Sequence, residues 1–286
     1  MEAPPAASPQ AQGAAAPSSS KSASKPAESP ADEPVAPQRP ASYKPAVPRL
    51  TARTATGQLV NKCVPKRLWN SVRTLTTKDR KHLSTLIPGK GTNAVYFGHQ
   101  YGGQVCNFLD LAEQMAARGY RVILPEFRGH VASEAAGASS PLDMRAAFHE
   151  LKTLHARHVF LAGESCGGTT AVVEGVRSGI PIVGLLLLSS PARCDGDAVS
   201  AVSAVSAVRT IEQPSLFMVT HEDMQGRHEK QLREVYDASP ATQKHFVVVD
   251  GEAHGTLMLY GDDAADARRT KVVDFMTHTY AAALRK

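Results

Sequence analysis

The sequence contains no long apolar run, since its longest, Ile182 to Leu188, has only seven residues. A membrane-spanning helix needs about 20 consecutive apolar residues, so no transmembrane segment is predicted. The first twenty residues also lack the basic and apolar regions of a secretory signal peptide. We therefore expect a cytoplasmic protein, with export by a route that needs no signal peptide as the alternative.

Cysteine is scarce, with four residues in a chain of 286. Cys63, Cys106, Cys166 and Cys194 lack the C-x-x-C spacing of zinc and redox sites, and they are too few for a disulfide scaffold. Reduced thiols in a cytosol-like compartment fit the sequence best. The phosphate-binding patterns G-x-x-x-x-G-K-S/T and G-x-G-x-x-G are absent, and we expect neither a cofactor nor a metal.

Large apolar side chains are rare in the first fifty residues, of which thirty-two are Ala, Pro or Ser. Such a segment cannot bury enough apolar surface to offset the entropy lost on ordering. We predict a disordered tail over residues 1–55. Residues 56–286 are predicted to form one domain, which is long enough to bury a substantial core.

The net charge of +5 is unevenly distributed along the chain. Residues 1–50 carry +1, residues 51–82 carry +7 and residues 83–286 carry −3, so the folded part is mildly acidic. A basic stretch can contact RNA, acidic lipid or an acidic protein, but charged hairpin edges and linkers are ordinary solvated surface. We expect no nucleic-acid partner, and the oligomeric state is left open.

From residue 72 onward, strand-like and helix-like patterns alternate. Residues 72–87 predict an antiparallel hairpin. Strands are then expected at 93–98, 120–125, 158–163, 182–189, 215–220 and 245–250, and helices at 104–118, 142–156, 166–177, 227–237 and 267–284. An Ala-Val-Ser repeat over 198–208 predicts one further short helix. The order predicts an α/β fold with a doubly wound, mostly parallel sheet and helices on both faces.

A G-x-S-x-G sequence at residues 163–167 directly follows one of these strands and opens a helix. A serine hydroxyl is a weak nucleophile, and it has to stand clear of the sheet on a sharp turn whose flanking positions tolerate little side chain. The pattern therefore indicates Ser165 as a nucleophile. A plain glycine-rich turn is the alternative interpretation.

An activated serine needs a base and an acid that orients the base. His254 follows the last predicted strand, and imidazole titrates near neutrality, so His254 is the predicted base. Asp223, at the end of the strand over 215–220, is the predicted acid, with Glu222 and Asp250 as competitors. The order nucleophile, acid, base is typical of α/β-hydrolases.

The oxyanion of an acyl-transfer intermediate requires backbone N–H donors. The amide of Cys166 directly follows the nucleophile at a helix start, where the dipole favours negative charge. We expect the second donor in the loop after residues 93–98, at Tyr101, whose side chain can instead pack over the pocket.

Over roughly residues 68–286 the sequence resembles the α/β-hydrolase superfamily. Residues 119–130, GYRVILPEFRGH, are similar to that superfamily's segment G-Y-x-V-x-x-P-D-x-R-G-H-G. The departures from the family pattern are Gln100, Glu126, Val131 and Thr220. Serine at the elbow argues against the branches that use an aspartate nucleophile. The link between residues 189 and 215 is short, so the resemblance implies a small or absent cap and a site open to bulky acyl groups.

The predicted function is that of a cofactor-independent serine hydrolase acting on a carboxylic ester or thioester, of the carboxylesterase, lipase or thioesterase type. One alternative is an inactive α/β-hydrolase fold used as a binding module. Another is an exported bacterial effector that hydrolyses host acyl substrates, which only the tail composition suggests. The sequence also leaves open an acyl acceptor other than water.

Overall fold

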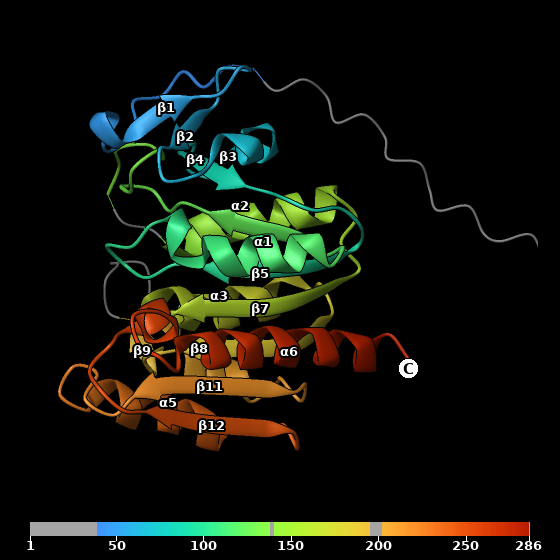
Figure 1. Ribbon diagram of the computed structural model, residues 1–286. Coiled ribbons are helices and arrows are strands. Elements are labelled where there is room, and N and C mark those ends of the chain that lie inside the picture. Colours follow the sequence, from blue (N-terminus) through green and yellow to red (C-terminus); the bar gives the residue numbers. More distant parts are fainter. Residues whose placement is uncertain (1–38, 138–139, 195–201, 286) are drawn as a thin grey trace, which may run out of the picture. The chain divides into compact units, whose positions relative to one another are not determined.

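The computed structural model describes residues 39–137, 140–194 and 202–285 (Figure 1). Most of the predicted tail lies outside these ranges. Residues 39–55, which we expected to belong to the tail, contain η1 (Pro48–Leu50) and β1 (Thr51–Arg53). Tyr43 is buried, and its hydroxyl donates to the carbonyl oxygen of Ala132 at 2.8 Å. The folded domain therefore begins before the predicted boundary at residue 56.

An eight-stranded sheet lies at the centre of the molecule, in the order β12-β11-β8-β7-β5-β6-β4-β3. Its strands are β3 (Val72–Thr76), β4 (His82–Leu86), β5 (Asn93–Gly98), β6 (Arg121–Pro125), β7 (His158–Glu164), β8 (Ile182–Leu188), β11 (Ser215–Thr220) and β12 (Lys244–Val249). The predicted hairpin is β3–β4, which joins the sheet antiparallel through β6. The other six strands pair with one another in parallel; they are β5, β6, β7, β8, β11 and β12. The predicted doubly wound, mostly parallel sheet is confirmed.

Helices cover both faces of the sheet (Figure 1). One face carries η3 (Val105–Phe108), α1 (Leu109–Ala117), η4 (Gly255–Leu259) and α6 (Ala265–Ala283). The other carries α2 (Ser140–Thr153), α3 (Ser165–Ser178), α4 (Ala204–Val208) and α5 (Arg227–Ala238). Two apolar cores result, one on each side of the sheet. Helix α6 begins near the carboxyl ends of the parallel strands and runs back along them. The described chain therefore ends near the amino ends of these strands (Figure 1).

Small elements complete the fold. Strand β1 pairs with β2 (Leu59–Asn61), and η2 (Lys66–Ser71) leads into the main sheet. In the link between β8 and β11 the structure describes β9 (Arg193–Cys194), β10 (Val202–Ser203) and α4, with residues 195–201 outside the description. The Ala-Val-Ser repeat thus forms a helix over its last five residues, and the described part of the link contains no larger cap.

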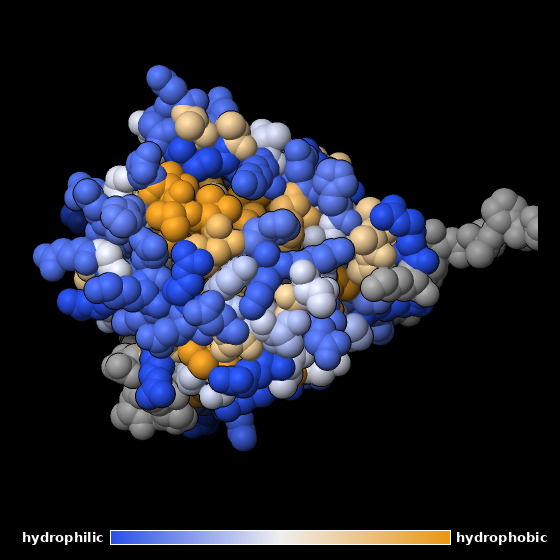
Figure 2. Space-filling model, turned by 90° about the horizontal axis from the view of Figure 1, so that it is seen from below, coloured by the Kyte–Doolittle hydropathy of each residue, from blue (hydrophilic) through white to orange (hydrophobic). Residues whose placement is uncertain are grey.

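Strand β12 forms one edge of the sheet, since β11 is its only neighbour among the described strands. Its sequence KHFVVV is largely apolar, and Val248 is 41% exposed. Figure 2, which views the molecule from this edge, shows apolar side chains gathered in a patch bordered by hydrophilic ones. Edge strands with exposed apolar side chains are sites at which proteins can associate, so a charged substitution at Val248 would reduce the apolar surface of this edge.

The four cysteines form two disulfides, Cys63–Cys106 and Cys166–Cys194, whose Cα atoms lie 6.2 and 5.6 Å apart. The prediction that all four cysteines are reduced thiols is therefore wrong. Spacing along the chain does not show which cysteines meet in space, and these partners are 43 and 28 residues apart.

No helix among the described residues is long and apolar enough to cross a membrane.

We expect the native protein to react with a thiol-alkylating reagent only after reduction, because all four sulfur atoms are in disulfides. Mass spectrometry of alkylated protein, unfolded in denaturant with and without a reductant, measures this. The denaturant exposes every cysteine, so burial cannot hide a free thiol. Alkylation of the unfolded, unreduced protein would contradict the expected pairing.

Candidate active site

Ser165 is the first residue of α3 and directly follows β7. Its φ of +49° lies in the left-handed region, which costs a non-glycine residue conformational energy. A Cβ atom added to Gly167 would lie 2.2 Å from the carbonyl oxygen of His99, and one added to Gly163 would lie 2.6 Å from Cα of Gly168. Glycine is therefore required here, because the start of α3 lies against the ends of β5 and β7. This geometry is the sharp strand-to-helix turn that the G-x-S-x-G sequence predicts.

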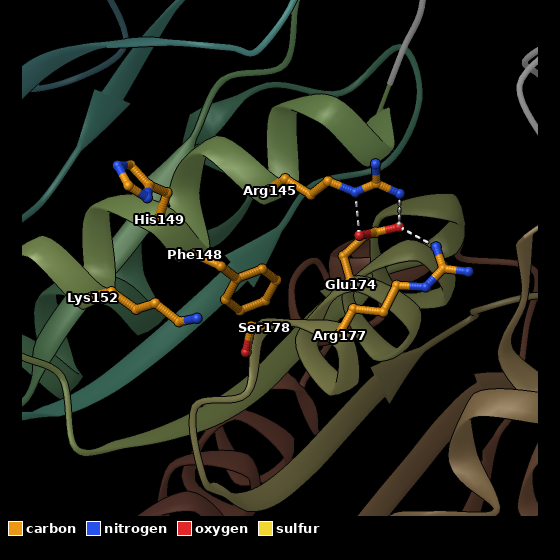
Figure 3. Close-up of a pocket in the computed structure, with 7 residues that line it drawn as sticks. All are labelled: Arg145, Phe148, His149, Lys152, Glu174, Arg177 and Ser178. Carbon is orange, nitrogen blue, oxygen red and sulfur yellow. Dashed lines mark hydrogen bonds and ion pairs between the residues drawn. The ribbon is translucent and has the colours of Figure 1, made fainter.

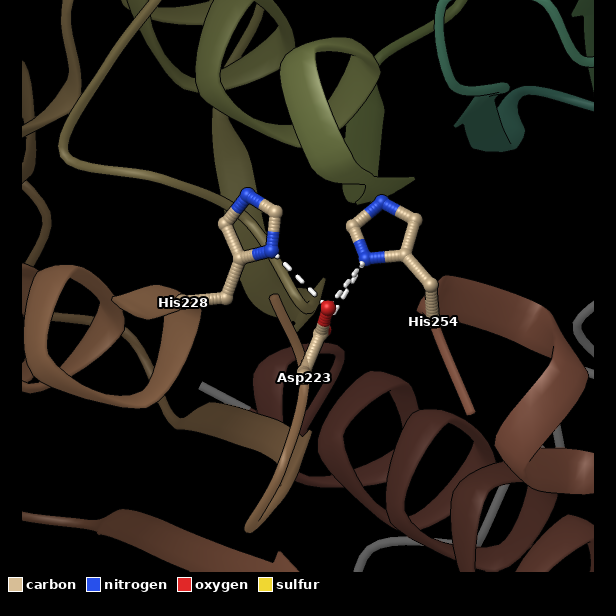
Figure 4. Close-up of side chains that lie close together, drawn as sticks. All are labelled: Asp223, His228 and His254. Atoms are coloured by element: carbon tan, nitrogen blue, oxygen red, sulfur yellow. Dashed lines mark hydrogen bonds and ion pairs between the residues drawn. The ribbon is translucent and has the colours of Figure 1, made fainter. Parts of the chain in front are cut away.

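The predicted base and acid are in direct contact. Nδ1 of His254 lies 2.8 and 2.9 Å from the two carboxylate oxygens of Asp223, and it donates to them because an ionised carboxylate only accepts (Figure 4). Asp223 is buried, whereas the competitors Glu222 and Asp250 are exposed. The contact leaves Nε2 of His254 pointing away from the carboxylate (Figure 4).

Two further residues hold the Asp223 carboxylate, and the sequence patterns did not indicate either. His228, the second residue of α5, places its Nδ1 2.9 Å from Oδ1 of Asp223. Ser189 also hydrogen-bonds the carboxylate, and its hydroxyl accepts from the Gly255 amide at 3.0 Å. Burial raises the pKa of Asp223, but the bonds from two imidazole rings and the Ser189 hydroxyl outweigh it, so this pKa lies well below its usual range.

Glu164 connects the loops around Ser165. Its buried carboxylate accepts from the backbone amide and the hydroxyl of Thr256 at 2.6 and 2.8 Å. It also accepts from the Asn107 side chain at 2.7 Å and from the Gln100 amide at 3.2 Å. The residue before Ser165 thus binds the segment that follows His254 and the loop that follows β5. No sequence motif indicated this role, although an acidic residue at the end of an apolar strand is a weak signal.

One predicted oxyanion donor, Tyr101, lies in the loop that follows β5, and the other, Cys166, lies in the first turn of α3. The amide of Gln100 is bound to Glu164, that of Gly102 to Nε2 of His130, and that of Gly103 to the Gln100 carbonyl oxygen. The Tyr101 amide has no acceptor among the described residues. Its side chain is 73% exposed and touches the edge of the His130 ring. Cys166 lies in the first turn of α3, where backbone amides have no partner within the helix.

A neutral histidine, His99, supports this loop. Burial and the neighbouring His130 lower the pKa of His99 to about 3. Its Nε2 accepts from the Phe127 amide at 3.0 Å, so Nδ1 carries the proton and donates to the Gln100 carbonyl oxygen at 2.8 Å. The loop therefore depends on hydrogen bonds that an uncharged imidazole makes.

Two of the four departures from the family pattern, Thr220 and Glu126, form hydrogen bonds with neighbouring residues. The Thr220 hydroxyl donates to the Ala253 carbonyl oxygen at 2.9 Å, which fixes the chain just before His254. The buried Glu126 carboxylate accepts from Asn61 at 2.7 Å and from the Ala132 amide at 2.8 Å. Neither substitution disturbs the contact between His254 and Asp223.

Asp223, His228 and His254 could in principle hold a metal ion, since one donor atom of each lies within 4.8 Å of the others. Two imidazoles and a carboxylate are a ligand set that suits zinc. In the described structure, however, both Nδ1 atoms donate to the carboxylate, and metal binding would require both protons to leave. The arrangement fits a hydrogen-bonded network without an ion.

A separate groove of about 370 Å³ lies between α2 and α3 (Figure 3). The buried Glu174 carboxylate at its wall binds Arg145 at 2.6 Å and Arg177 at 2.7 Å. Its lining residues include none of the predicted catalytic residues; they are Arg145, Phe148, His149, Lys152, Glu174, Arg177 and Ser178. The groove therefore has no part in the candidate site.

The chain is similar to one protein family and to solved structures of esterases and lipases. Residues 89–210 match the family model described as serine aminopeptidase, S33. No curated protein sequence matches the chain.

Three solved structures illustrate the likeness. An esterase of Pyrococcus furiosus is 16% identical with a TM-score of 0.61, over 84% of this chain and 99% of that one. A Paleococcus ferrophilus monoacylglycerol lipase is 16% identical with a TM-score of 0.56, over 69% and 99%. An esterase of Rhodococcus sp. is 14% identical with a TM-score of 0.57, over 72% and 98%. At such identities the likeness concerns the fold.

Proposed function

We propose that this chain, which has the α/β-hydrolase fold and matches a serine aminopeptidase family model over residues 89–210, is a serine hydrolase that cleaves a carboxylic ester or thioester through an acyl-enzyme intermediate. The observation that carries the proposal is the hydrogen bond from His254 to the buried Asp223 carboxylate. Ser165 supports it, since it occupies a left-handed position at the strand-to-helix turn. The similar esterase and lipase structures favour an ester substrate.

In the proposed mechanism, the Ser165 hydroxyl attacks the substrate carbonyl carbon while Nε2 of His254 accepts its proton. Asp223 keeps the proton of His254 on Nδ1 and stabilises the imidazolium that forms. The amides of Tyr101 and Cys166 donate to the oxyanion. His254 then protonates the leaving group, and a water molecule activated by the same ring hydrolyses the acyl-enzyme.

For the location, we propose the exported alternative, because disulfides persist in oxidising compartments and are rare in the cytosol. Cell fractionation combined with the thiol measurement described above tests it. Protein that is recovered from the cytosol with free thiols would contradict export.

A fluorophosphonate probe tests the nucleophile, since it phosphonylates only activated serines. We expect the purified protein to be labelled, and Ser165→Ala and His254→Ala to lose the label. Ser178→Ala is the matched control, because Ser178 lies on the same helix at its far end and binds the Gly175 carbonyl oxygen. Its labelling should equal that of the unaltered protein.

The same proteins are then assayed with aryl esters of increasing acyl length and with the corresponding thioesters and amides. Turnover that Ser165→Ala abolishes would support the proposal, and the preferred chain length would define the acyl group. A folded protein that neither binds the probe nor hydrolyses any of these substrates would favour a binding module instead.

A further inference from the structure

We propose that His228 is a positioning residue of the hydrolytic site, whose neutral ring donates a second imidazole hydrogen bond to Asp223 and so fixes the carboxylate that orients His254. The inference rests on the proposed function. It assigns a role to a histidine that lies five residues after the acid and outside the family pattern considered above.

The backbone between Asp223 and His228 is shaped to bring the two together. Met224, Gln225 and Gly226 have φ values of +48°, +59° and +74°, three consecutive residues in the left-handed region. Two of them are not glycine, and each such position costs free energy that the surrounding structure has to supply. The turn returns the chain so that the His228 amide lies 3.4 Å from the Asp223 carbonyl oxygen, with the ring over the carboxylate.

The two imidazole rings flank the carboxylate almost symmetrically (Figure 4). Their Nδ1 atoms lie 2.9 Å and 2.8 Å from Oδ1 of Asp223, and their ring centroids are 4.7 Å apart. The side chain of His228 is 13% exposed, that of His254 is 23% exposed and that of Asp223 is 1% exposed. Water therefore has little access to the carboxylate, and the two rings supply much of its solvation.

Charge assigns different roles to the two rings. Among the described residues, the titratable groups that contact the His228 ring are Asp223, after β11, and His254, after β12. On its own helix, the neighbouring Glu229 binds His221 instead. Because a single carboxylate compensates only one imidazolium charge, a state in which both rings are charged is electrostatically unfavourable. His254 becomes charged during turnover, so His228 serves as the neutral donor.

Removing this donor has a definite sign. A carboxylate that loses a hydrogen bond becomes a stronger acceptor for the remaining ones and stabilises a protonated His254 more. The pKa of His254 should therefore rise. Because the protonated ring cannot accept the serine proton, the acidic limb of the kcat/KM profile should move to higher pH. The carboxylate would also be less well oriented, which lowers kcat.

The test uses His228→Phe, which keeps a planar ring but removes the donor, and His228→Asn, whose side-chain amide can replace Nδ1–H. For His228→Phe we expect kcat to fall about 10-fold with KM nearly unchanged, since a hydrogen bond to a charged group has about this effect. The midpoint of the acidic limb of the kcat/KM profile should shift to higher pH by about half a pH unit or more. His228→Asn should restore most of kcat. His221→Phe is the control, since His221 precedes the same turn and its side chain is 70% exposed.

An NMR titration of the His254 ring in the full-length Ser165→Ala protein, with and without His228→Phe, gives a readout that does not depend on activity. A higher pKa of His254 in the double variant supports the inference. An unchanged pKa, together with an unchanged pH profile, would overturn it even if His228→Phe lowers the melting temperature. If the pKa rises but the unaltered protein hydrolyses no ester, the positioning role stands and the proposed function fails.

Discussion

Replacing Ser165 with alanine is expected to lower kcat for ester hydrolysis by about 10⁶-fold, because no other group can form the acyl-enzyme. The fold should be preserved, since the Ser165 hydroxyl makes no hydrogen bond to another side chain in the described structure. The left-handed φ of +49° is retained, and alanine tolerates it about as poorly as serine. Circular dichroism and thermal unfolding should therefore match those of the unaltered protein.

Combining this variant with others tests whether the three residues act together. Members of a catalytic triad are strongly non-additive, because the base and the acid serve only the nucleophile. His254→Ala and Asp223→Asn should each lower kcat severely, yet adding either to Ser165→Ala should cause no further loss. Multiplicative losses in the double variants would contradict the proposed triad. Ser178→Ala again serves as the control on the same helix.

Replacing Glu164 with alanine is expected to lower the free energy of unfolding by about 4 kcal/mol, because it leaves several buried donors without an acceptor. These donors are the Gln100 amide, the Asn107 side chain, and the amide and hydroxyl of Thr256. They belong to the loops that carry the proposed oxyanion donor and base. We therefore also expect kcat to fall about 100-fold in the folded protein, since small misplacements of catalytic groups have this effect. Denaturant unfolding and steady-state kinetics below the unfolding transition measure the two quantities.

Glu174 provides the matched control for this experiment. Its carboxylate is fully buried, like that of Glu164. Glu174 lies on α3, however, and its partners Arg145 and Arg177 line the separate groove. Glu174→Ala should destabilise the protein and leave kcat unchanged. If Glu164→Ala also destabilises the protein without changing kcat, Glu164 only stabilises the fold and does not position the catalytic loops.

The sequence sufficed for the fold and for the contact between base and acid. Alternation of strand and helix patterns defines a parallel sheet, and side chains at the carboxyl ends of its strands come together at one edge. Asp223 follows one strand and His254 the next, so their contact could be predicted without knowing the loop conformations. The same argument does not separate Asp223 from Glu222, which follows the same strand; the structure does, because Asp223 is buried and Glu222 is exposed.

The supporting residues could not be predicted, because their contacts depend on the path of loops. Ser189 and Glu164 reach their partners across 66 and 92 residues of sequence. The contact of His228 with Asp223 depends on a turn of three consecutive left-handed residues. Only one of the three is glycine, so the sequence gives little indication of this turn. The disulfides were missed for the same reason. The tail was predicted from the average composition of the first fifty residues. Such an average hides single residues, such as Tyr43, that are buried in the domain, so the predicted start of the domain was too late.

The direction of α6 determines how the molecule can be attached to a support. This helix carries the chain from the carboxyl ends of the parallel strands, where Ser165 and His254 lie, to the amino ends of these strands (Figure 1). A resin or a fused carrier joined at the far end of α6 would therefore lie away from the carboxyl ends of the parallel strands, and the proposed catalytic residues would face the solution. Immobilised in that way on a non-porous surface, the protein should keep its proposed catalytic residues accessible to large substrates.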